Sequence, residues 1–153
     1  MIPEQLPVLV KHFEGLSKVR SDGLVYAYLC PAGYPTQGYG IRVASLDVPP
    51  ISKDEAESRL QAVLPGYISD TLALCPALSG EPAKLAAIAD FTFNLGKTRL
   101  AASTLRRRIN VRDWAGARRE LSKWVWGKNP STGAMEKLPG LVLRREAEAA
   151  LLN

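Results

Sequence analysis

The sequence predicts an α+β fold that is mostly helical, with a small β-sheet-containing N-terminal lobe, a larger helical C-terminal lobe, and a cleft between them. Residues 24–47 combine short alternating stretches with many glycines and prolines, which is typical of short strands joined by tight turns. Residues 82–94 are apolar nearly all round, which is typical of a helix buried at the centre of a helical lobe. Ligands commonly bind in clefts between such lobes.

The length and composition fit one domain with a core of its own. The chain has 153 residues, of which 46% are hydrophobic and 23% are charged. We expect a single domain over 1–153, with a small lobe at about 14–52. The helical lobe would cover about 53–153 and include the N-terminal helix.

The first predicted element is a helix over residues 5–16, because apolar side chains recur there at the spacing of one helical face. Gly15 stands at its end, and glycine commonly terminates helices. Residues 17–23 are polar and read as a loop, and two or three strands follow over 24–47. The apolar face of the helix consists of Leu6, Leu9, Val10 and Phe13.

The second half of the chain reads as a series of helices. Ser52 with Glu55 three positions later is a capping-box pattern, which starts a helix over roughly 53–72 that Pro65 could disturb. Ser79 is a candidate cap for the next helix, whose first turn would hold Pro82 and which would end at Gly96. Shorter helices are expected near 98–109, 111–125 and 139–152.

The charge and cysteine content limit the classes of function. The net charge of +5 favours an anionic partner: nucleic acid, a membrane surface or an acidic cell-wall polymer. Two distant cysteines, Cys30 and Cys75, and a single histidine give neither a disulfide framework nor the spacing of a metal site, so we expect no metal and no cofactor. The N-terminus has the pattern of neither a signal peptide nor a membrane span.

Glu14 is the strongest candidate for acid–base chemistry. It stands at the end of an apolar helix, where partial burial and the helix dipole both disfavour a negative charge and so favour the protonated acid. General-acid catalysis at neutral pH needs such a carboxyl group. The alternative is an ordinary surface glutamate at a helix end. Thr36 alone reads as a common strand residue, and Cys30 could serve chemistry, a disulfide or packing.

Two basic stretches, at 105–108 and 143–148, could contact phosphate groups. The plainer interpretation is a charged, solvated helix face. On that interpretation Arg144 and Glu148, four positions apart, would support each other as an ion pair.

Ordered sequence blocks resemble the phage-type lysozymes, glycoside hydrolase family 24, which include phage endolysins. The blocks are "FEGL", "AYLCPAGYPTQGYG", "FTFNLG", "STLRRRIN", Trp124 and "LPGLVLRREAE", and they run from Phe13 to near the C-terminus. The resemblance implies a lysozyme-like fold and a catalytic set of a Glu, then an Asp or sometimes a Cys, then a Thr six positions later. Glu14, Cys30 and Thr36 match these roles.

The chain departs from the family pattern in two places. Fifteen residues separate Glu14 from Cys30, more than the family usually has, and residues 17–23 can account for the excess as a loop insertion. Asp22 in this insertion is an alternative carboxylate, although its Ser-Asp-Gly context is first of all a turn sequence. Ile41 stands where the family often has a histidine.

The resemblance implies hydrolysis of the β-1,4 bond between N-acetylmuramic acid and N-acetylglucosamine in bacterial cell walls. Glu14 would protonate the leaving oxygen, and Cys30 with Thr36 would hold and activate a water on the other face of the sugar. A neutral thiol is a poor base, so either a positive neighbour lowers its pKa or Thr36 and the water do most of the work. A bond to Cys75 would remove the thiol from chemistry. We also predict that Arg144 or Arg145 lies near Glu14.

Two other functions stay open: a lytic transglycosylase, which needs only the glutamate, and a non-catalytic peptidoglycan-binding protein. We expect peptidoglycan glycan strands as the partner, no nucleic acid, a monomer, and outer-membrane contact as an option for the basic surface. The resemblance implies synthesis in the host bacterial cytoplasm and action on periplasmic peptidoglycan after passage through a holin-type pore, with host lysis as the result.

Overall fold

The N-terminal helix ends where its first glycine allows the chain to turn. The computed structural model describes residues 1–153, and helix α1 (Gln5–Glu14) opens it. Gly15 has a φ of 64°, and its N–H donates to the Lys11 carbonyl at 3.0 Å. This conformation suits glycine, so the helix stops two residues before the expected end. Leu6 and Val10 are fully buried on its inner face.

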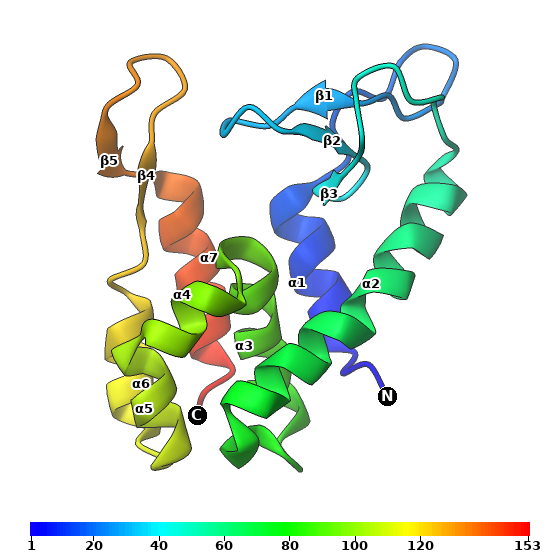
Figure 1. Ribbon diagram of the computed structural model, residues 1–153. Coiled ribbons are helices and arrows are strands. Elements are labelled where there is room, and N and C mark those ends of the chain that lie inside the picture. Colours follow the sequence, from blue (N-terminus) through cyan, green and yellow to red (C-terminus); the bar gives the residue numbers. More distant parts are fainter.

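The expected small sheet is present as three short antiparallel strands in the order β1-β2-β3 (Figure 1). The strands are β1 (Tyr28–Leu29), β2 (Pro35–Gln37) and β3 (Ile41–Arg42). Thr36 pairs with Tyr28 on one side and with Arg42 on the other. Because paired residues lie on the same face of a sheet, these three side chains share one face.

The second half of the chain is a set of helices packed around α3, joined by short turns. Ser52 caps the longest helix through its Oγ, which accepts the Glu55 N–H at 3.0 Å, and Pro65 does not interrupt that helix. The helices are α2 (Lys53–Leu74), the short 3-10 helix η1 (Pro76–Leu78), α3 (Pro82–Leu95), α4 (Lys97–Ala102), α5 (Thr104–Asn110), α6 (Trp114–Leu121) and α7 (Pro139–Ala150).

Three local expectations for these helices are wrong. Ser79 ends η1 and does not cap α3, whose N-cap position belongs to Glu81. The helix expected over 98–109 is divided at Ser103, whose Oγ accepts the Arg106 N–H and so starts a new helix. The helix expected over 111–125 is shorter, Trp114–Leu121, and a β-hairpin with no expected counterpart follows it, β4 (Trp126–Lys128) with β5 (Met135–Lys137).

Helix α3 is the centre of the fold, as its apolar sequence predicts. It contacts α1, α2, α4 and α7, and its residues from Leu85 to Thr92 are buried. The sheet and the β4–β5 hairpin lie at one end of the molecule, and both termini lie toward the other (Figure 1). None of the helices combines the length and the apolarity needed to cross a bilayer.

Candidate active site

A cleft of about 730 Å³ lies between the sheet and the helices. Its 17 lining residues come from the end of α1, the three strands with their turns, α2 and the last turn of α3. Glu14, Cys30 and Thr36 all line it. The fold therefore brings the three candidate residues into one cavity, although a long loop separates the first from the other two.

Glu14 is held at the last turn of α1, with 23% of its side chain exposed. Arg144 Nη1 donates to Glu14 Oε1 at 2.9 Å, which confirms the expectation that one of the two arginines lies near this carboxylate. On the other side lies Gly40, in the turn between β2 and β3. A Cβ built on Gly40 would lie 2.8 Å from Glu14 Oε2, and its φ of +72° also favours glycine. The sheet can approach the acid this closely only because residue 40 has no side chain.

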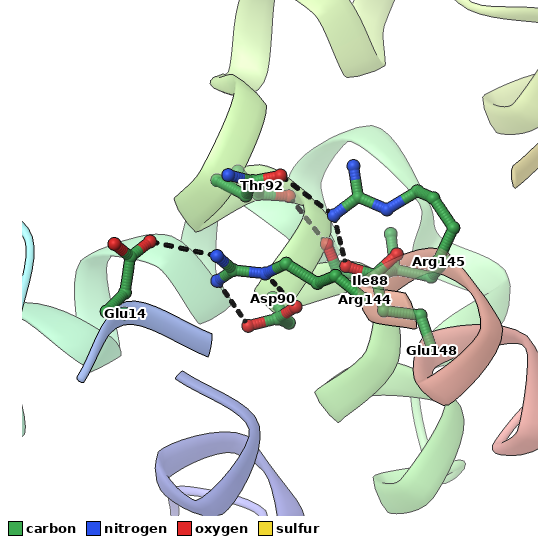
Figure 2. Close-up of polar contacts among 8 residues, drawn as sticks. Glu14, Ile88, Asp90, Thr92, Arg144, Arg145 and Glu148 are labelled. Carbon is green, nitrogen blue, oxygen red and sulfur yellow. Dashed lines mark hydrogen bonds and ion pairs between the residues drawn. The ribbon is translucent and has the colours of Figure 1, made fainter. Parts of the chain in front are cut away.

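Arg144 links the acid to the core of the helical region (Figure 2). Its Nε and Nη2 donate to the two oxygens of Asp90 on α3, each at 2.8 Å, and Asp90 is fully buried. Burial alone would lower the pKa of Arg144, but Asp90 and Glu14 outweigh burial and raise that pKa above its usual value. The expected pairing of Arg144 with Glu148 is therefore wrong, because Arg144 pairs across to α3 and α1.

A second buried pair lies beside the first on α7. Arg145 Nη2 donates to Glu148 Oε1 at 2.6 Å and to Asn94 Oδ1 at 2.9 Å, and Asn94 lines the cleft. Arg145 and Glu148 are almost fully buried, at 1% and 0% exposed. Burial and the neighbouring Asp90 carboxyl raise the pKa of Glu148 well above its usual value, although Arg145 opposes this. This part of α7 is not the solvated face that its charges suggested.

Cys30 and Thr36 sit on the β1–β2 hairpin. The Cys30 N–H donates to the Tyr34 carbonyl at 3.0 Å, and the Gly33 N–H donates to the Cys30 carbonyl at 2.8 Å, which closes a tight turn. Thr36 is 3% exposed, and its hydroxyl also donates to the Tyr34 carbonyl, at 2.9 Å. The hydroxyl proton is thus engaged, and its oxygen lone pairs remain free to accept a hydrogen bond.

The Cys30 thiol is a stronger acid than an ordinary cysteine. Partial burial raises its pKa, but hydrogen bonds from the backbone of Tyr34, Ala32 and Gly33 outweigh burial and lower the pKa below its usual value. The sequence suggested two alternatives, a positive neighbour that lowers this pKa or a reaction in which Thr36 and the water do most of the work. Backbone amides of the hairpin turn supply the stabilisation.

The disulfide alternative is wrong, because both cysteines are free thiols. Cys75 is fully buried in the helical region, at the end of α2. Burial raises the pKa of the Cys75 thiol to about 11, with Arg106 opposing the shift. Cys75 is therefore a packing residue, and Cys30 is the one thiol in the cleft.

Asp22 does not supply a second carboxylate to the cleft. Its oxygens accept hydrogen bonds from the Leu24 N–H at 2.9 Å and from the Tyr26 hydroxyl at 2.5 Å, and these bonds lower its pKa. It is exposed and absent from the cleft lining. The turn interpretation of the insertion is the correct one, and Glu14 is the one carboxylate that lines the cleft.

Sequence reasoning missed Asp90, Asn94 and Gly40. A signal for Asp90 was available: an aspartate in an otherwise apolar helix is rarely buried without a cationic partner. Gly40 carried no such signal, because its role depends on how close the sheet comes to Glu14.

Known proteins resemble this chain in sequence and in fold. The profile of the phage lysozyme family matches residues 11–148. An endolysin of Acyrthosiphon pisum secondary endosymbiont phage 1 is 34% identical over 160 residues, covering 99% of this chain and 97% of that protein. Among solved structures, the muramidase domain of SpmX from Asticaccaulis excentricus superposes with a TM-score of 0.72 at 23% identity, covering 99% of this chain and 97% of that one. An endolysin from Escherichia coli phage FAHEc1 gives a TM-score of 0.72 at 24% identity, covering 99% and 92%.

Proposed function

The chain belongs to the phage lysozyme family and is a peptidoglycan-degrading glycoside hydrolase, and from this premise we propose that Glu14 is its general acid and that Cys30 and Thr36 bind and activate the attacking water. The observation that carries the proposal is that Glu14 is the one carboxylate in the cleft and shares it with a thiol of lowered pKa. Inverting glycoside hydrolysis requires one group that donates a proton to the leaving oxygen and a second group that accepts a proton from the attacking water.

The acid acts through the oxygen that Arg144 leaves free. Arg144 occupies Glu14 Oε1, so Oε2 carries the proton that passes to the glycosidic oxygen as the bond from that oxygen to the anomeric carbon breaks. Asp90 offsets the positive charge of Arg144 through two hydrogen bonds. Arg144 can then orient Glu14 from within the helical core.

The water is activated on the hairpin side. Because the Thr36 hydroxyl donates to the Tyr34 carbonyl, its oxygen can accept a hydrogen bond from the water and fix the water's orientation. The Cys30 thiolate accepts the second proton as the water oxygen attacks the anomeric carbon. Its negative charge also stabilises the positive charge that develops on the sugar. Attack from the side opposite to the acid inverts the configuration at that carbon.

In its biological setting the enzyme acts on bacterial peptidoglycan in host lysis. The proposal includes a monomeric enzyme that reaches the wall through a holin-type pore, as the family resemblance implies. The net charge of +5 supports contact with anionic wall or outer-membrane surfaces.

A lytic transglycosylase is the second candidate, and the presence of a single carboxylate in the cleft favours it. That reaction needs one acid–base residue, and the cleft holds one carboxylate. Its product is a 1,6-anhydro sugar, formed when the sugar's own hydroxyl attacks the anomeric carbon in place of water.

Mass spectrometry of digested, purified peptidoglycan separates the two reactions. We expect muropeptides with reducing ends, which are heavier by one water than the anhydro products, and no release by a Glu14→Gln variant. Anhydro products would establish the transglycosylase instead. A wild-type protein that binds the wall and releases nothing would overturn both and leave a binding module.

A further inference from the structure

One basic side chain lines the cleft. Among the 17 lining residues Arg42 is the sole arginine or lysine, since Arg144 lies behind the cleft and is buried. Arg42 is in β3 and pairs in register with Thr36. A positive group therefore stands next to the proposed water-binding residue, on the same face of the sheet.

The guanidinium of Arg42 is held in place without an anionic partner. Its Cζ lies 3.7 Å from the centroid of the Tyr34 ring. Arg42 takes part in none of the ion pairs of the chain. Stacking uses the flat face of a guanidinium, so the N–H groups along its edge stay available for a planar acceptor.

A carboxylate is the planar anion that suits such an edge, because two parallel N–H groups can donate to its two oxygens. We propose that Arg42, oriented by Tyr34, is a carboxylate-binding residue that recognises the acidic substituents of N-acetylmuramic acid. This inference rests on the proposed function and adds a specificity determinant to it.

The chemistry of the substrate gives this residue something to select. Each muramic acid unit carries a lactyl group, which is either free as a carboxylate or extended by a stem peptide with carboxylates of its own. N-acetylglucosamine carries no acid. A cation at the cleft rim therefore distinguishes peptidoglycan from neutral polymers of N-acetylglucosamine and fixes which sugar lies beside Thr36.

Both Arg42 and Tyr34 are exposed. Water and salt therefore screen the interaction, and its effect falls as ionic strength rises. The stack with Tyr34 offsets part of this weakness, because a side chain that is already ordered loses less freedom when the ligand binds.

The test measures binding in a Glu14→Gln background, so that no ligand is consumed. Three purified glycan strands are compared: one that carries stem peptides, one with the peptides removed and free lactyl carboxylates, and one with those carboxylates converted to methyl esters. Arg42→Gln is compared with Arg119→Gln, which removes the same charge from an exposed residue outside the cleft.

We expect Arg42→Gln to lower the ratio of acidic-strand to ester-strand affinity about fivefold to tenfold at low salt, and Arg119→Gln to leave the ratio unchanged. A lowered ratio for the peptide-free acidic strand identifies the lactyl carboxylate as the ligand. A lowered ratio for the peptide-bearing strand alone identifies the stem.

The inference would be overturned if Arg42→Gln lowered the affinity equally for all three strands or for none of them. The same change in the affinity ratio with Arg119→Gln would also overturn it. A wild-type enzyme that degrades peptidoglycan would then still support the proposed function. Failure of wild type to degrade any strand would count against the function itself, so the two failures are distinguishable.

Discussion

The two walls of the cleft are built in different ways. Glu14 is held from far away in sequence: its partner Arg144 is 130 residues later, and that arginine is anchored by a buried aspartate on a third helix. Cys30 and Thr36 are held within the small sheet, by hydrogen bonds of the turn between Cys30 and Tyr34 and by the pairing of Thr36 with its neighbouring strands. The acid depends on the packing of the helical region, whereas the thiol depends on one local turn.

Because the two walls are held in different ways, some substitutions should affect stability and others chemistry alone. A buried network of charges loses several kcal/mol when one member is removed, because the remaining charge is left unpaired. An exposed hairpin turn contributes little to the core. Removing a buried charge of the acid wall (Asp90 or Arg144 behind Glu14) should therefore lower stability as well as activity. Substitutions at the thiol wall (Cys30 and Thr36) should act mainly on rate and pH dependence.

The largest effect is expected for Glu14→Gln, which removes the proposed proton donor and keeps the shape of the side chain. Activity on peptidoglycan should fall by about 10³-fold, within the range for loss of a general acid. The thermal unfolding midpoint should change little, because the amide oxygen can still accept from Arg144. Glu146→Gln, at an exposed carboxylate on the same helix as Arg144, is the control and should stay active. An active Glu14→Gln enzyme would contradict the assignment of the acid.

Asp90→Ala should show how far the acid wall depends on the helical core. It leaves Arg144 buried with Glu14 as its one partner, and we expect the free energy of unfolding to fall by about 3–5 kcal/mol. Chemical denaturation measures this directly. Lys123→Ala removes an ion pair whose lysine is 68% exposed, and it should cost less than about 1 kcal/mol. Equal losses in the two variants would show that the buried network is no stronger than a surface pair.

Gly40→Ala tests the point at which the two walls meet. A methyl group there would press on Glu14 Oε2, so we expect roughly a tenfold loss of kcat, of the order produced by displacing a catalytic group. Gly23→Ala is a matched control: its φ of +77° carries a similar backbone strain, but nothing lies within 4 Å of the added carbon. Both variants should lose about 1 kcal/mol of stability, and the loss of rate should be confined to residue 40.

The smallest effect concerns Glu148, behind the acid wall. Its pKa is raised in the folded protein, so the folded state holds a proton that the unfolded state releases first. Protonated Glu148 therefore stabilises the fold fully at a pH below the pKa of the unfolded state. This stabilisation is lost as the pH rises toward the pKa of the folded state. Glu148→Gln removes this titration, so its stability relative to wild type should rise as pH increases above the unfolded pKa of about 4.3. A difference that stays flat over this range would show that Glu148 is ionised in the fold.

The sequence was sufficient for whatever depends on local pattern. The N-terminal helix, the short strands, the cap at Ser52 and the central apolar helix follow from periodicity and turn residues, and the structure contains all of them. The β4–β5 hairpin was missed, because its Gly127 and exposed Trp126 lie in a stretch without a clear strand period.

The site was predictable only in part. The resemblance supplied Glu14, Cys30 and Thr36, but the contacts that hold Glu14 join three helices, and no spacing rule relates them. The charges on α7 even pointed to the wrong pairing, because Arg144 and Glu148 four positions apart look like a surface pair. The cause of the lowered Cys30 pKa could not be predicted from the sequence either, because it depends on where backbone N–H groups point within the folded turn.

We propose that a thiolate stabilised by the hairpin works opposite a general acid held by the helical core. The most direct test is the pH–rate profile of peptidoglycan cleavage by wild type, Cys30→Asp and Cys30→Ala. Wild-type activity should rise as pH increases through a pKa below the usual thiol value of about 8.5. Cys30→Asp should keep or exceed the wild-type rate and extend activity to lower pH, because a carboxylate ionises earlier. Cys30→Ala should lose this limb and at least about 10²-fold in rate. A Cys30→Ala enzyme with the wild-type rate and profile would show that the thiol has no part in the reaction.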